Sequence, residues 1–85
     1  MTQTKAQHQA SAGSYLTAAT GAGYTDPIDK LRAAIAAAQL AATTNQSANV
    51  SIAEGLLSEI ENRSTVSLPP GELAYVHALL ATQTT

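Results

Sequence analysis

The sequence holds two histidines, His8 and His77, whose side chains are the ones best suited to acid–base or metal chemistry near neutral pH. A metal site on a helix needs a second ligand three or four residues away, but His77 has Leu80 and Ala81 at those positions. Glu72 lies five residues before His77 and therefore on another face of a helix. We interpret His77 as a helix histidine that is partly exposed or part of an interface.

Two pairs of acidic residues, Asp26 with Asp29 and Glu59 with Glu61, are the other groups that could do chemistry together. Asp26 precedes Pro27, which is typical of a helix N-terminus, so the first pair is expected to cap a helix. The second pair is interpreted as part of a solvated helix face. No nucleotide-binding, nucleophile or metalloprotease motif occurs in the sequence. We therefore expect no enzyme activity, cofactor, metal site or small-molecule substrate.

The start signal at Asp26-Pro27 predicts a helix over about residues 27–43. An apolar stripe recurs along it at spacings of three and four residues, formed by Ile28, Leu31, Ile35, Ala38 and Ala42. Much of the remaining surface of this helix is alanine, which lets neighbouring backbones approach closely. We expect it to be contacted on two faces.

Two further helices are predicted, over about residues 51–63 and 70–82. Ser51 and Glu54 match the capping box that marks a helix start, although a start near Ser47 is also open. Gly55 lies inside this helix, where glycine is costly, and could mark a close helix crossing. The prediction is an all-α protein with a small three-helix domain over residues 26–85.

Residues 1–25 consist mainly of Ala, Gly, Ser, Thr and Gln, and such a segment buries too little apolar surface to order itself. A short helix from about Ser14 to Thr20 is possible, but the expectation is an extended, low-complexity N-terminal arm. If the arm binds a partner, its larger side chains are the candidate contacts, namely Tyr15, Leu16 and Tyr24. In the domain, the candidate contacts are the apolar side chains that lie off the main stripes, Leu40 and Leu79.

Composition restricts the class of protein further. The chain has no Cys, Phe or Trp, so its core is thin and has no disulfide support, which favours association with itself or with another chain. The net charge is −2, and four scattered basic residues predict no nucleic-acid binding. The longest apolar run, residues 33–38, is far too short for a membrane span. Gln7 to Gln9 interrupt the apolar stretch that a signal peptide needs, so we expect a soluble protein of the cytoplasm or of a virion.

These observations favour a non-catalytic structural or accessory subunit of a larger protein assembly or homo-oligomer. It would bind its partners through the N-terminal arm and through apolar helix faces. Among such assemblies we favour a virion, with the chain as a small structural or capsid-cement protein such as phages contain, because viral accessory chains are often short, rich in Ala and Thr, and poor in Lys. The alternative is a soluble regulatory adaptor or inhibitor that binds one protein through a helix face.

Overall fold

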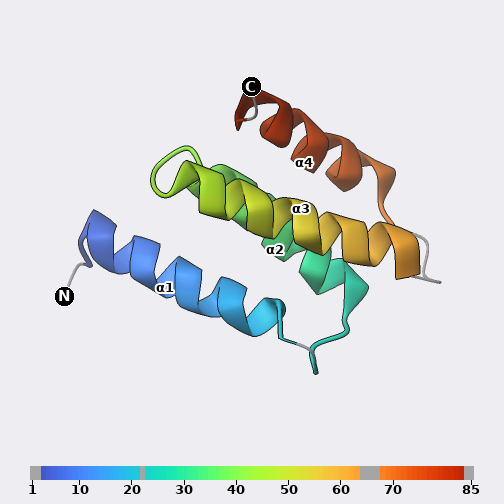
Figure 1. Cartoon of the computed structure of the whole chain (residues 1–85), viewed down its shortest axis with the longest axis horizontal. Helices are drawn as coiled ribbons and strands as arrows, with labels where there is room; N and C mark the ends of the chain where they lie inside the picture. Colours follow the sequence, from blue (N-terminus) through green and yellow to red (C-terminus); the bar gives the residue numbers. More distant parts are fainter. Residues whose placement is uncertain (1–2, 22, 64–67, 84–85) are drawn as a thin grey trace.

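The computed structural model describes residues 3–21, 23–63 and 68–83, and within these ranges it contains helices and no strand (Figure 1). The four helices are α1 (Lys5–Ala19), α2 (Pro27–Leu40), α3 (Gln46–Arg63) and α4 (Pro70–Gln83). The prediction of an all-α protein is confirmed. The molecule measures 41 × 31 × 20 Å along its principal axes, and the shortest of these extents corresponds to about two helix diameters. The helices therefore form a flat arrangement of two layers.

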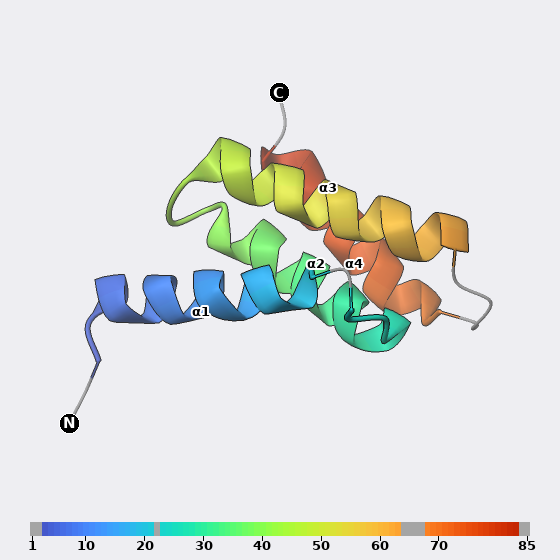
Figure 2. The ribbon, with the colours of Figure 1, turned by 60° about the horizontal axis from the view of Figure 1, so that its bottom comes forward.

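Helix α2 is the central element. It packs against α1, α3 and α4, whereas α1 comes within 8 Å of no helix other than α2 when Cα atoms of the described residues are compared. Figure 1 shows α2 crossing behind α3, with α1 and α4 on different sides of this pair, and Figure 2 shows α2 between α1 and α3 with α4 behind α3. The prediction that α2 is contacted on more than one face is confirmed.

Small side chains on α2 allow this close packing. Ala34, Ala37 and Ala38 have no exposed surface, and Leu31 is equally buried beside them. The predicted stripe is only partly buried, since Ile28 and Ile35 keep some exposure and Ala42 is exposed. The buried face is rotated toward the alanines because a methyl side chain lets a neighbouring helix axis approach more closely than a branched one does.

The start of α3 differs from the main prediction. The helix begins at Gln46, close to the alternative start near Ser47, so Ser51 and Glu54 lie within the helix and form no capping box. Asn45 has a positive φ of 43°, a conformation that asparagine tolerates better than most residues. The Asn49 side chain donates a hydrogen bond to the carbonyl oxygen of Thr44, 2.9 Å away, and holds the turn against the helix.

The N-terminal segment is helical over Lys5–Ala19, which corrects the expectation of an extended arm. Thr4 and Gln7 form a capping box, in which each side chain accepts a hydrogen bond from the backbone N–H of the other residue. Leu16 and Ala19 are buried, and the Gln9 side chain reaches Thr43. Composition correctly showed that this segment buries little, but one leucine and small residues suffice for it to pack on the alanine-rich helix.

Gly55 does not mark a close helix crossing. It is exposed, and a Cβ atom built at this position would have no atom within 4 Å outside its own helix. The glycine therefore lowers the helix propensity of α3 without a packing benefit in this chain. None of the helices in the described ranges combines the length and the apolar character that a membrane crossing requires.

Candidate functional site

A groove of about 420 Å³ lies between α3 and α4 and is lined by side chains of both helices. Both helices pack on α2, but they approach each other less extensively than either approaches α2, which leaves space between them. The groove has an apolar floor and polar walls, and its lining residues are Glu54, Leu57, Ser58 and Glu61 from α3 and His77, Leu80 and Ala81 from α4.

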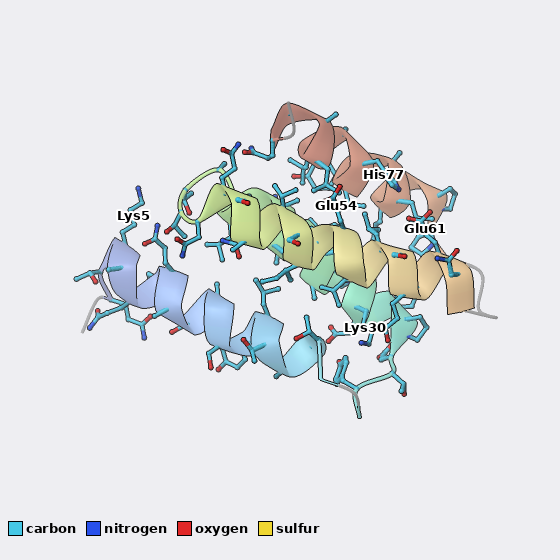
Figure 3. All side chains as sticks on the ribbon, viewed as in Figure 1. Lys5, Lys30, Glu54, Glu61 and His77 are labelled. Atoms are coloured by element: carbon cyan, nitrogen blue, oxygen red, sulfur yellow. The ribbon has the colours of Figure 1, made fainter. Side chains whose placement is uncertain are left out.

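Helix periodicity aligns the residues that α3 contributes to the groove. Glu54 and Glu61 are two turns apart and Leu57 lies between them, so all three share one face. Leu57 is buried at the floor, whereas both glutamates are exposed at the wall. Figure 3 shows both glutamates on the side of α3 that faces α4.

His77 forms the opposite wall and bonds across the groove. Its Nε2 atom lies 3.2 Å from Glu61 Oε1, and both side chains are exposed. Sequence spacing did not reveal this pair because the residues come from different helices. Chemically, the pair fixes the position of the imidazole. The third ionisable residue in the described lining, Glu54, makes no hydrogen bond or ion pair with His77 or Glu61.

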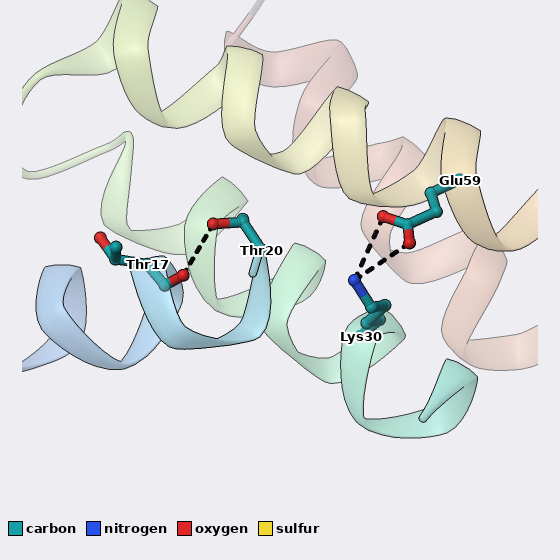
Figure 4. A network of polar contacts seen from close by, with 4 residues as sticks. All are labelled: Thr17, Thr20, Lys30 and Glu59. Carbon is teal, nitrogen blue, oxygen red and sulfur yellow. Dashed lines mark hydrogen bonds and ion pairs between the residues drawn. The ribbon is translucent and has the colours of Figure 1, made fainter. Parts of the chain in front are cut away.

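Glu59 and Glu61 do not act as a pair, because residues two apart point to different sides of a helix. Glu59 faces α2, where both of its carboxylate oxygens lie 3.1 Å from Lys30 Nζ (Figure 4). The Lys30 side chain is only 2% exposed, while Glu59 is 39% exposed. Lys30 precedes Ala34 by one turn and so shares the buried face of α2, which is the sequence signal that could have indicated its burial.

Tyr24 covers the same end of α2. Its ring centroid lies 6.0 Å from Lys30 Nζ, and its hydroxyl donates a hydrogen bond to a carboxylate oxygen of Asp29. This hydrogen bond, with lesser contributions from burial and from the charges of Asp29 and Asp26, raises the pKa of Tyr24 from 10.0 to about 12. The expected capping role of Asp26 is confirmed, because its carboxylate accepts hydrogen bonds from the backbone N–H groups of Ile28 and Asp29.

The candidate contact residues from the sequence lie in different places and form no common site. Leu16 is buried in the core, and Leu40 and Leu79 are partly buried against it. Tyr24 is partly buried and bonded to Asp29 within the chain. Tyr15 is 78% exposed on α1 and is the one candidate whose surface is largely free to meet another molecule.

Comparison of this chain with known proteins does not indicate what the groove binds. No family model matches the chain, and neither the curated proteins nor the solved structures include a significant match. Within the described ranges, no three His, Asp or Glu side chains lie together in a way that could hold a metal ion. The interpretation of the groove therefore depends on its own shape and chemistry.

Proposed function

We propose that this protein is a non-catalytic accessory subunit of a larger assembly, and that the groove between α3 and α4 receives a segment of a partner protein. The observation that carries the proposal is the groove itself, with Leu57 and Leu80 below, Ala81 at its edge, and polar side chains on both walls. An apolar centre within a polar rim is the usual composition of a protein-binding surface. Assemblies of virions and of cells are both compatible with this function.

Two exposed aromatic side chains add support. Tyr15 on α1 is 78% exposed and Tyr75 on α4 is 47% exposed, although the chain has only three tyrosines and no other aromatic residue. The Tyr75 hydroxyl accepts a hydrogen bond from Gln39 Nε2 at 2.8 Å, so its ring is held in place on the surface. Ordered, exposed tyrosines bind partners at a low entropic cost.

Site-specific photo-cross-linking in the source cells tests the proposal. A photoreactive residue replaces Ala81 at the edge of the groove in one protein and Ala36, which is exposed on α2, in the control. We expect a defined cross-linked protein from position 81 and not from position 36. Blocking the groove with Ser58→Gln should abolish the product, while Ala74→Gln on the exposed surface of α4 should leave it unchanged. Equal cross-linking at both positions, or none at position 81, would contradict the proposal.

The alternative, a free regulatory adaptor, is favoured by a different observation. All four helices contribute buried residues to the core, including Leu16 of α1 and Val76 of α4, so the chain encloses its core without a second molecule. Light scattering of the native protein from cells, at its native concentration, separates the two functions. A pool of free monomer together with a transient complex indicates an adaptor. Recovery of all of the protein in one large complex indicates a subunit.

A further inference from the structure

We infer that the segment bound in the α3/α4 groove is a basic amphipathic helix of a partner protein. This inference rests on the proposed function and specifies the partner of that same site. It follows from three properties of the groove, namely its charge, the helices that form both of its walls, and the position of its apolar floor.

The charge of the groove is negative on the α3 side. Glu54 and Glu61 are seven residues apart on one face, which separates their backbones by roughly 10 Å along the helix axis. The exposed Glu54 carboxylate makes no hydrogen bond or ion pair with another described residue, so it is free to pair with a ligand cation. Glu61 contacts His77 through Oε1 and has a second oxygen available.

Among the side chains that the structure describes, no Lys or Arg lines the groove to neutralise these carboxylates. Lys30 is buried against Glu59 on another face of α3, and Lys5 lies at the far end of α1 (Figure 3). His77 is the one basic residue in the described lining of the groove, and it contacts Glu61 rather than Glu54. A partner with positive charge is therefore favoured over an acidic peptide or a nucleic acid, which these carboxylates repel.

The walls favour a helix over an extended segment. Both walls are α-helices, whose backbone N–H and C=O groups are bonded within the helix, so an incoming strand would find no backbone edge with which to pair. A helix satisfies its own backbone hydrogen bonds and needs only side-chain contacts from the groove. A third helix laid between α3 and α4 would also continue the side-by-side arrangement of these helices visible in Figure 1.

The floor determines the pattern of the partner helix. An apolar side chain would rest on Leu57, Leu80 and Ala81, between two basic side chains about seven residues apart that reach Glu54 and Glu61. The expected sequence pattern is Lys or Arg, then Leu, Ile or Met about one turn later, then Lys or Arg about one turn after that. A partner that lacks either basic residue should bind more weakly.

Binding of synthetic peptides to the full-length protein tests the inference. The basic probe is a helix-stabilised 14-residue peptide, the length of α4, with leucines on one face flanked by lysines seven residues apart. The acidic probe has glutamates in place of the lysines. We expect the basic peptide to shift the NMR signals of Leu57, His77 and Ala81, and to bind more than tenfold more tightly than the acidic peptide.

Matched variants examine the role of charge. Glu54→Gln should lower the affinity for the basic peptide about two- to fivefold, as expected for the loss of one exposed ion pair, and Glu54→Lys should lower this affinity further. Asp29→Asn removes the same charge outside the groove and should leave binding unchanged. Added salt should weaken the wild-type complex more than the Glu54→Gln complex, which keeps only the ion pair with Glu61.

Other outcomes would overturn the inference in distinct ways. If both peptides bind equally in the groove and Glu54→Gln has no effect, the partner segment is not basic, and the proposed function still stands. Concentration-dependent shifts of the groove signals without peptide would assign the groove to a second copy of this chain. If neither peptide moves these signals but cross-linking at position 81 succeeds, the partner is of another kind. Failure of both experiments would overturn the proposed function as well.

Discussion

Lys30 places a buried ammonium group against the carboxylate of Glu59. It is 2% exposed, and Glu59 is its ion-pair partner. Removal of only one member of a buried pair leaves the other charge without compensation, and here the two members differ in exposure. Lys30 has the greater need of its partner, because Glu59 can turn to water.

This asymmetry predicts unequal effects of two substitutions. Glu59→Gln should lower the free energy of unfolding by about 2 kcal/mol, because it leaves the Lys30 ammonium buried and unpaired. Lys30→Met should cost less than about 1 kcal/mol, because the long apolar chain is kept and Glu59 becomes solvated. Urea unfolding of both variants and of the double variant gives the coupling energy. Equal losses from the two single variants would contradict this account.

Tyr24 predicts a dependence of stability on high pH. Its pKa is raised to about 12 by the hydrogen bond to Asp29, whereas an unfolded tyrosine titrates near 10. A folded-state pKa above the unfolded value means that the contribution to stability is fully present below about pH 10 and is lost as the pH rises toward 12. The tyrosinate absorbance of the wild type minus that of Tyr24→Phe should show this late titration. Asp29→Asn should move it toward lower pH, and a late titration that survives Asp29→Asn would exclude the hydrogen bond as its main cause.

At the scale of the elements, α2 could be predicted more completely than the others. Asp26 and Pro27 are local signals, and the structure uses them as helix cap and first residue. The α3 start was predicted less well, because the turn at Asn45 depends on its positive φ and on a hydrogen bond from Asn49, neither of which a periodic pattern contains. The groove could not be predicted, because it joins residues of two helices whose relative position depends on packing against α2.

The helix α1 had a local signal that composition obscured. Thr4 and Gln7 match the capping box, yet the absence of large apolar residues suggested an arm. What holds the segment is its contact with α2 through Leu16 and Ala19, which is a tertiary effect. The helix over residues 5–19 therefore depends more on its packing against α2 than on the helix propensity of its own residues.

Gly13 tests this conclusion within α1. A Cβ atom at this position would meet nothing within 4 Å beyond the helix itself, so Gly13→Ala adds helix propensity without a clash. We expect the free energy of unfolding to rise by about 0.5–1 kcal/mol, and a similar rise for the control Gly55→Ala in α3. Thermal unfolding followed by circular dichroism measures both. A rise for Gly55→Ala with none for Gly13→Ala would indicate that α1 is not part of the cooperative fold.

At the scale of the whole molecule, the flat arrangement depends on one central helix with neighbours on several sides. Because α1 contacts only α2 among the helices of the described residues, its removal should leave the contacts of α2 with α3 and α4 in place. The groove, which is formed by α3 and α4, should persist. Folding stability and partner binding are thus carried by different parts of the chain and can be separated by experiment.

Removal of residues 1–20 makes this separation measurable. The shortened chain loses the burial of Leu16 and Ala19 and uncovers the α2 surface beneath them, so its free energy of unfolding should fall by about 2–3 kcal/mol. Leu16→Ala in the full-length chain should produce most of this loss, whereas Tyr15→Ala, at an exposed neighbouring position, should produce little. Urea unfolding gives the stabilities, and peptide titration at low temperature should show an unchanged affinity of the groove. If affinity is lost along with α1 while α3 and α4 stay folded, α1 contributes directly to the binding surface, and the division between a stabilising helix and a binding groove is wrong.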